Sequence, residues 1–98
     1  MEHNPNIHYI YLPIKGHWLG MIKSGIKHEE YREMSKCNMR QFDKVNRIIA
    51  SSFDKVVIRF HQYRGIYHEA TIKSVRIGQR NPAWGAPSGK DVIIYQLD

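Results

Sequence analysis

The order of apolar and polar side chains predicts a chain of alternating strands and helices. Strict alternation, as in residues 7–14, is typical of half-buried strands, and spacings of three and four residues are typical of helices. In the first strand, Ile10 and Leu12 take one side and Tyr9 and Tyr11 the other, with Pro13 expected at an edge or near the strand end. The predicted strands cover 7–14, 27–34, 55–63, 66–77 and 91–97, and the predicted helices cover 17–24 and 35–52.

Two details of this pattern predict how the sheet is shaped. In strand 66–77, the apolar residues up to Ile72 lie on one face of the strand and those after it lie on the other. This change of face indicates a bulge or bend near Lys73 and Ser74. The last strand carries consecutive apolar residues at 92–94, which favours a central place in the sheet. We therefore expect an α+β fold with a small mixed sheet, curled into a partial barrel with helices at its rim. The segment 79–89, with Trp84 in its middle, is expected to form an ordered loop.

The composition is that of one globular domain, spanning 1–98. The chain has 98 residues, of which 42% are hydrophobic and 24% charged. No apolar run approaches the roughly 20 residues of a membrane helix, and residues 1–5 do not resemble a signal peptide. With a single cysteine, Cys37, which has no partner for an internal disulfide, the chain is expected to be cytoplasmic.

The chain carries 15 Lys and Arg against 9 Asp and Glu, a formal charge of +6, which favours an anionic partner. Part of the excess lies on one face of the second predicted helix, opposite its apolar stripe, because 100° per residue places these side chains within roughly 80°. A solvated helix face is the alternative interpretation. The candidate phosphate-binding residues are Lys36, Arg40, Lys44 and Arg47, together with Arg76 and Arg80.

The segment from Gly25 to Arg32 combines a turn residue with charges of both signs. Gly25 allows a sharp turn after the first helix, and Lys27, Glu30 and Arg32 follow it. These three side chains can hold a polar ligand, or they can be the solvated charges of an edge strand. In a regular strand Lys27 points away from the other two. We therefore expect all three to meet only if the strand begins after Lys27 or bends there.

Several motifs together resemble ASCH domains, which belong to the PUA-like superfamily. They span nearly the whole chain and are similar to a small single-domain type found in phages and bacteria. The resemblance implies a β-barrel of five or six strands, with two or three short helices, and a cleft beside the Gly-x-Lys loop. It also implies binding of RNA or a modified nucleoside. The motifs are Leu12-Pro13-Ile14-Lys15, Trp18 with Ile22, the run from Gly25 to Arg32, Val57-Ile58-Arg59-Phe60, Arg76-Ile77-Gly78, Asn81-Pro82 and Trp84-Gly85-Ala86-Pro87.

The resemblance leaves an enzymatic function open. Some PUA-like relatives hydrolyse acylated cytidine with a lysine at the position of Lys27 and a threonine three residues later, where this chain has Glu30. Without that hydroxyl the mechanism does not transfer directly, although burial could make Lys27 a base. Other members are ribonucleases, for which Lys27 and Tyr31 are candidates. The candidate catalytic residues are Lys27, Glu30 and Tyr31, and a protein-interaction adaptor is the third hypothesis.

Two tryptophans are candidates for stacking on bases, although a core role is the commoner one for Trp18. No metal or cofactor is expected, because the six His form no His-x-x-x-His pair and the segment from Gly85 to Asp91 departs from a phosphate loop in length and sequence. No Ser-His-Asp set is recognisable, and the oligomeric state stays open. The candidate ligand-binding residues are Lys15, Trp18, Lys27, Glu30, Arg32, Arg59 and Trp84.

Overall fold

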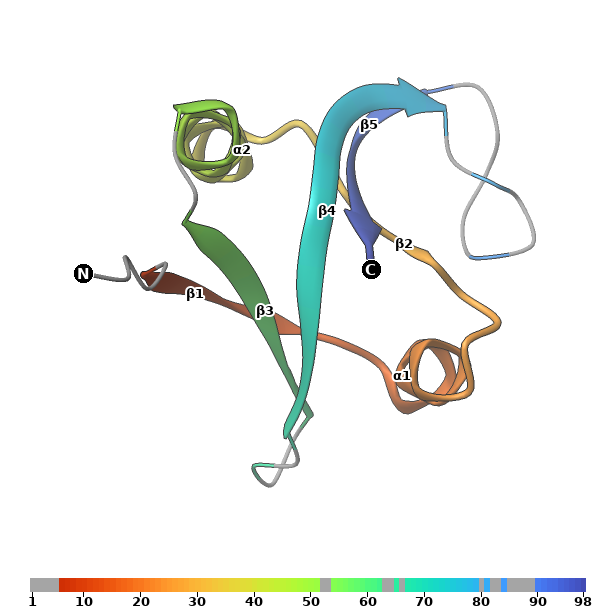
Figure 1. Ribbon diagram of the computed structural model, residues 1–98. Helices are drawn as coiled ribbons and strands as arrows, with labels where there is room; N and C mark the ends of the chain where they lie inside the picture. Colours follow the sequence, from red (N-terminus) through yellow and green to blue (C-terminus); the bar gives the residue numbers. More distant parts are fainter. Residues whose placement is uncertain are drawn as a thin grey trace.

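The protein is described by a computed structural model that covers residues 6–51, 54–62, 65, 67–79, 81, 84 and 90–98. The described residues form five strands and two helices in the predicted order, and the last three strands follow the second helix (Figure 1). Their bounds are β1 Ile7–Pro13, α1 Gly16–Lys23, β2 Glu29–Arg32, α2 Lys36–Ser51, β3 Lys55–His61, β4 Tyr67–Gln79 and β5 Asp91–Leu97.

The five strands form one mixed sheet in the order β1-β3-β4-β5-β2. β1 pairs with β3 in parallel, and the other neighbouring pairs are antiparallel. The α+β class with a mixed sheet is thus confirmed. The β-barrel that the resemblance implies is not closed: β1 and β2 remain the two edges of the sheet, because closure needs a continuous ladder between them. Across the gap, Nη2 of Arg32 donates a hydrogen bond of 2.6 Å to the carbonyl of Pro13.

The long strand β4 changes partner along its length. Residues 67–71 pair with β3, and residues 72–79 pair with β5. The register shifts between Ile72 and Ser74, which confirms the bulge predicted from the change of phase. A bulge bends a strand and increases its twist, and Figure 1 shows β4 curving over towards β5. The two halves of the sheet therefore wrap around one core.

The core lies inside this curled sheet and includes residues of both helices. Leu19 and Ile22 of α1 and Val45 of α2 are buried together with inward residues of every strand except β2. The strand residues are Ile10, Leu12, Val56, Ile58, Phe60, Ile72, Ile93, Tyr95 and Leu97. Figure 1 places α1 and α2 at opposite corners of the sheet, so the two helices cover different parts of the core. With 16 residues, α2 matches the helix predicted over 35–52.

Burial differs from the pattern at one position of β3. The alternation places Val57 outward with Arg59, yet Val57 is only 9% exposed. It does not belong to the core cluster. It lies opposite Tyr9 in the parallel ladder, so side chains on the outer face cover it. In contrast, β5 is interior in the sheet and buried from Val92 to Tyr95, as predicted.

Neither helix of the described residues is long and apolar enough to cross a membrane.

Candidate functional site

A turn after α1 brings Lys27 back under the helix. Gly25 adopts a φ of 80°, a left-handed conformation that glycine accepts without a steric penalty. The amides of Ile26 and Lys27 both donate to the carbonyl of Met21, at 2.9 and 3.0 Å. The hydroxyl of Ser24 donates to the same carbonyl at 3.1 Å, so this acceptor at the end of the helix is satisfied. The chain therefore reverses within a few residues, and Lys27 lies inside the fold with a relative exposure of 2%.

The strand that follows begins only at Glu29, which meets the condition for the three charged side chains to gather. Glu30 and Arg32 share one face of β2, and Lys27 approaches them from outside the strand. Nζ of Lys27 lies 3.7 Å from Oε1 of Glu30, and Nη2 of Arg32 lies 3.6 Å from Oε2. We refer to Lys27, Glu30 and Arg32 as the Lys27 cluster. The structure brings these predicted site residues together.

The cluster is buried but incompletely hydrogen-bonded. The side chains of Lys27 and Glu30 are 1% and 8% exposed. Oε1 of Glu30 accepts a bond of 2.9 Å from the amide of Tyr31. Oε2 of Glu30 and Nε of Arg32 are buried and make no hydrogen bond within the described part of the chain. A buried polar atom left unpaired costs about 1–3 kcal/mol, so such groups are normally satisfied. The cluster thus offers an acceptor and a donor side by side.

Burial controls the protonation of Lys27. Desolvation lowers the pKa of its ammonium group, and the neighbouring carboxylates of Glu30 and Glu29 partly offset this effect. Nζ donates a hydrogen bond to the carbonyl of Glu29. It also lies 4.6 Å from the ring centroid of Tyr31 and 5.9 Å from that of Trp18. The lysine is therefore held among two aromatic rings and two carboxylates, and its burial there favours the neutral amine more than water does.

The other face of β2 carries a second hydrogen-bonded group. The hydroxyl of Tyr31 donates to Oε1 of Glu29 at 2.6 Å and accepts from the amide of Asn81 at 2.9 Å. Nη2 of Arg76 donates to Oε2 of Glu29 at 2.5 Å. Burial, followed by the bond to Glu29, raises the pKa of Tyr31 to about 12. Its hydroxyl is therefore engaged in structural bonds on the opposite face from Glu30, which argues against the predicted proton-transfer role.

A cavity of about 460 Å³ lies beside Lys27, and we refer to it as the Lys27 cavity. It is bounded by the end of α1, the middle of β4 and the end of β5. Sequence reasoning missed most of its polar residues, because they come from strands far apart in the chain. The residues that line it are Ile22, Lys23, Gly25, Lys27, His28, His68, Glu69, Ala70, Thr71, Leu97 and Asp98.

Two backbone hydrogen bonds join residues that line this cavity. The amide of Leu97 donates to the carbonyl of His28 at 2.8 Å, and the amide of Asp98 donates to the carbonyl of Thr71 at 2.9 Å. On the wall formed by β4, burial and the nearby Lys23 lower the pKa of His68. A neutral imidazole can both donate and accept a hydrogen bond. The cavity therefore combines an ammonium group, imidazoles and carboxylates.

The predicted ligand residues Trp18, Trp84 and Lys15 do not line the Lys27 cavity. Trp18 is half-buried on α1, next to Lys27 Nζ. Trp84 is also half-buried and packs edge-on against His28, with ring centroids 5.9 Å apart. Lys15 is exposed and lines a second cavity of about 550 Å³ with Pro13, Ile14, His61 and Gln62. The two tryptophans thus contact residues of the site, Trp18 lying next to Lys27 and Trp84 packing against His28.

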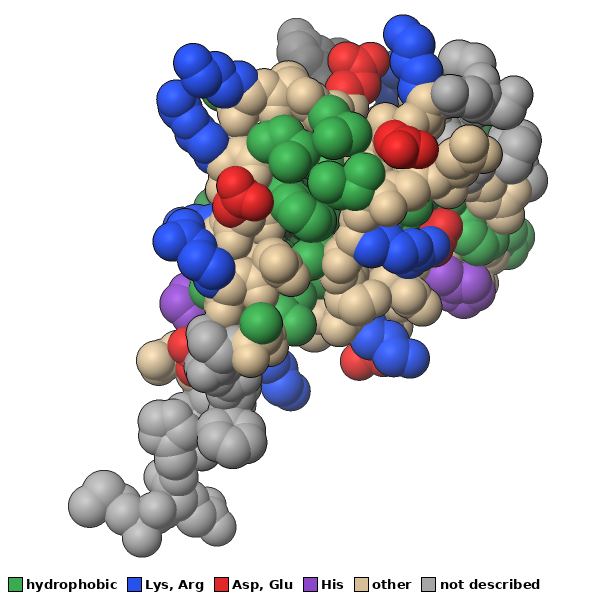
Figure 2. Space-filling view, turned by 90° about the horizontal axis from the view of Figure 1, so that it is seen from above, with side chains coloured by type: hydrophobic (Ala, Val, Ile, Leu, Met, Phe, Trp, Pro, Cys, Tyr) green, Lys and Arg blue, Asp and Glu red, His purple; other side chains and the backbone are tan. Residues whose placement is uncertain are grey.

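The predicted phosphate-binding residues do not gather at this site. Lys36, Arg40, Lys44 and Arg47 are exposed on α2, at the opposite corner of the sheet from α1 in Figure 1. Arg76 is bound to Glu29, and Arg80 lies outside the described residues. Figure 2 shows Lys and Arg side chains spread around an apolar patch, with acidic side chains between them. On that face the positive charges do not form a continuous track, and phosphate binding stays a prediction.

Arg59 lies on the outer face of the sheet, away from the Lys27 cluster. Its Nε donates to Oε1 of Glu69 at 2.7 Å, and its guanidinium carbon lies 4.0 Å from the ring centroid of Tyr9. Hydrogen bonding to Glu69 raises the pKa of Arg59. Since Glu69 also lines the Lys27 cavity, Arg59 borders the site through this carboxylate.

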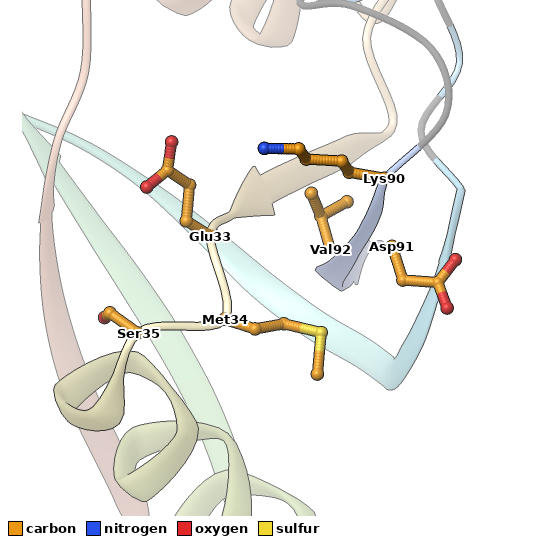
Figure 3. Close-up of a pocket in the computed structure, with 6 residues that line it drawn as sticks. All are labelled: Glu33, Met34, Ser35, Lys90, Asp91 and Val92. Atoms are coloured by element: carbon orange, nitrogen blue, oxygen red, sulfur yellow. The ribbon is translucent and has the colours of Figure 1, made fainter.

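A third cavity, of about 360 Å³, lies between the β2-α2 connection and the start of β5 (Figure 3). Its apolar part is Met34 and Val92. The side chain of Lys90 extends towards Glu33, whereas Asp91 points away. None of its residues belongs to the Lys27 cluster, and we assign it no role.

Within the part of the chain that the structure describes, no group of three or more His, Cys, Asp or Glu side chains could hold a metal ion. No known protein family, no curated protein and no solved structure matches the chain. The resemblance to ASCH domains therefore stays a prediction, and the function has to be argued from the site.

Proposed function

We propose that the protein binds RNA or a modified nucleoside, with one base held in the Lys27 cavity against the Lys27 cluster. The observation that carries this proposal is the buried acceptor Oε2 of Glu30 beside the buried donor Nε of Arg32, neither of which is hydrogen-bonded within the described residues. A nucleobase edge presents donors next to acceptors, and a glutamate accepts from the amino group of cytosine. Glu30 and Arg32 do not themselves line the cavity, which Lys27 borders, so a base edge satisfies these two atoms only when their side chains turn towards it.

The cavity agrees with a ligand of this class. Its volume of about 460 Å³ lies within the roughly 300–1,000 Å³ of small-molecule sites. The ammonium group of Lys27 could donate to a base carbonyl, and the net charge of +6 favours a phosphate-bearing partner. The resemblance to ASCH domains of the PUA-like superfamily and the cytoplasmic location stay predictions that fit the same ligand.

Calorimetric titration with cytidine, N4-acetylcytidine and uridine tests the proposal. We expect a cytosine derivative to bind more tightly than uridine, because only the cytosine edge carries an amino donor for Glu30. Glu30→Gln should weaken binding by about 10- to 100-fold, as expected for loss of a charged hydrogen bond. The matched control is Glu33→Gln, an exposed glutamate outside the cluster. Failure of all three nucleosides to bind, or equal affinity for wild type and Glu30→Gln, contradicts the proposal.

One observation favours hydrolysis of an acylated cytidine as a second candidate function. Burial lowers the pKa of Lys27, which raises the fraction of neutral amine that can act as a base. Nζ would take a proton from water while the water oxygen bonds to the acyl carbon. The bond between that carbon and the cytosine nitrogen then breaks, and the nitrogen takes the proton, which leaves cytidine and a carboxylic acid. Glu30 stands where the resembling enzymes carry threonine, so water has to be the nucleophile.

Release of cytidine from N4-acetylcytidine, followed by chromatography, tests this second function. Turnover that Lys27→Met abolishes, with the fold and nucleoside binding retained, would support it. If the wild-type protein shows no turnover, or the variant turns over as fast as wild type, Lys27 has no catalytic role. Nucleoside binding then remains as the proposed function.

A further inference from the structure

The outer face of the sheet carries two exposed tyrosines on β1. Tyr9 is 38% exposed and Tyr11 is 55% exposed, although both are large and partly apolar. The guanidinium carbon of Arg59 lies 4.0 Å from the ring centroid of Tyr9 and 5.9 Å from that of Tyr11. We refer to Tyr9, Tyr11 and Arg59 as the tyrosine platform. The proposed function gives these two tyrosines no role.

The platform is held in place by the sheet beneath it. Tyr9 lies opposite the buried Val57, and Tyr11 lies opposite Arg59 in the parallel β1-β3 ladder. Residues two apart on a strand point to the same face and are about 6.6 Å apart. The bond of 2.7 Å from Arg59 to Glu69 fixes the guanidinium between its neighbours. The aromatic and guanidinium planes are therefore positioned before any ligand arrives, which lowers the entropic cost of binding.

We propose that the tyrosine platform is a second contact surface, on which bases of single-stranded RNA stack. Tyrosine rings and arginine planes are the groups on which proteins stack unpaired bases, and every base has a flat face to offer. Lys55 lies on the same face, opposite Ile7, and can meet a phosphate. Since Arg59 is paired with Glu69, stacking rather than charge carries the interaction.

Two neighbouring residues, Glu69 and Pro13, link the platform to the Lys27 cavity and to the Lys27 cluster. Glu69, the partner of Arg59, lines that cavity. At the other end, Pro13 follows Tyr11 by two residues, and its carbonyl accepts the hydrogen bond from Arg32. Glu69 and Pro13 therefore connect the outer face of β1 to the candidate site. The inference goes beyond the proposed function, because stacking on this face does not require that the cavity be occupied.

A second copy of the chain is the competing occupant, since β1 is an edge strand and exposed edges can pair. Pairing of two outer faces would bury the ion pair of Arg59 and Glu69, and desolvation of such a pair is costly. A bound RNA strand, in contrast, would leave the ion pair at the edge of the platform exposed to water. The observations therefore favour RNA, and self-association becomes an outcome of the test.

The test is fluorescence anisotropy of a labelled single-stranded RNA octamer with wild type, Tyr9→Ala, Tyr11→Ala and the two Tyr→Phe variants. We expect each alanine variant to weaken binding at least about fivefold, because its ring no longer stacks. Each phenylalanine variant should stay within about twofold of wild type, since the phenyl face remains. Ile77→Ala, which truncates an exposed apolar residue of β4, is the matched control. Thermal unfolding of each variant shows that the fold is retained.

The outcomes separate this inference from the proposed function. Equal octamer affinity for wild type and the alanine variants overturns the platform, and so does an octamer that does not bind at all. If nucleosides bind but the tyrosine variants bind the octamer as wild type does, the proposed function stands and the platform falls. If the tyrosine variants weaken octamer binding but no nucleoside binds, the platform stands and the proposed function falls. A dimer in sedimentation that Tyr11→Ala dissociates, with no change in RNA affinity, assigns the face to self-association and overturns the inference.

Discussion

Lys27 and Glu30 form an ion pair inside the protein, with 3.7 Å between Nζ and Oε1 and almost no exposure of either side chain. The pair exists because the turn at Gly25 returns the chain under α1 and because β2 starts only at Glu29. Taking two charges out of water is costly, and their attraction repays the cost only when hydrogen bonds satisfy the remaining atoms. Oε2 of Glu30 lacks such a bond within the described residues, which points to a ligand-binding role for the pair.

The first prediction concerns the stability of the cluster. Glu30→Leu should lower the free energy of unfolding by about 3–5 kcal/mol, because it leaves two buried cations without their shared counter-charge. Adding Lys27→Met to that variant should recover part of the loss, since one of the stranded charges is removed. Urea unfolding of both single variants and the double variant measures the coupling. Strictly additive costs would show that the two side chains do not interact.

The control for this cycle is Lys23→Met, which removes an exposed lysine of α1. Its effect should stay within about 0.5 kcal/mol, as for most surface substitutions.

The second prediction concerns alkaline pH. Desolvation raises the pKa of Tyr95 to about 12, against a value of 10.0 in the unfolded chain. Between these values the folded state keeps a proton that the unfolded state has lost, so stability falls as the pH rises through this window. Tyr95→Phe should flatten that loss, by an amount on the order of 2 kcal/mol at its upper end. Urea unfolding between pH 9 and 12 measures it, and an equally steep loss in the variant would refute the assignment.

The third prediction concerns Lys27, whose contribution to stability changes with pH in the opposite direction to that of Tyr95. Burial lowers its pKa in the folded state below the ordinary value of 10.5. Between the lowered pKa and 10.5, the unfolded chain binds a proton that the folded state does not, so this contribution to stability rises with pH. Lys27→Met should remove the rise. Nitrogen NMR of the side-chain amine should show Lys27 titrating below the ordinary lysine value of 10.5, and titration at or above that value would contradict this prediction.

The fourth prediction concerns the basic face of α2. If its four cations meet phosphates, replacing Lys36, Arg40, Lys44 and Arg47 with Gln should flatten the salt dependence of RNA binding. The slope of log affinity against log salt should fall by about 0.7 for each phosphate that the variant no longer binds. Lys73→Gln with Lys90→Gln, two exposed lysines outside the proposed site, is the control. An unchanged slope in the α2 variant would identify the stripe as a solvated helix face.

Local features of the fold could be predicted from the sequence because they depend on neighbouring residues. The change of phase after Ile72 marks the bulge in β4, and the run from Val92 to Ile94 marks an interior strand. Strand closure could not be predicted in the same way. It depends on whether β1 and β2 pair along their length, and these edges are joined by a side-chain bond from Arg32 to Pro13 instead.

The candidate site was predictable only in part. Its centre, Lys27 with Glu30 and Arg32, follows from a turn and a short strand that are local in sequence. The walls of the cavity come from His68 and Glu69 of β4 and from Asp98 after β5. Their positions depend on the register of long-range strand pairs, which a single sequence does not reveal. The same holds for Arg76, whose partner Glu29 lies 47 residues away.

The decisive measurement for the nucleoside site is NMR mapping of the isotopically labelled protein during titration with N4-acetylcytidine. We expect saturable shifts that are largest at Lys27, His28, Glu30 and Arg32, with smaller ones at the cavity residues of β4. The side-chain resonances of Arg32 should show a new hydrogen bond at Nε. A spectrum that does not change, or shifts confined to α2 and the start of β5, would contradict the assignment of this cavity as a nucleoside site.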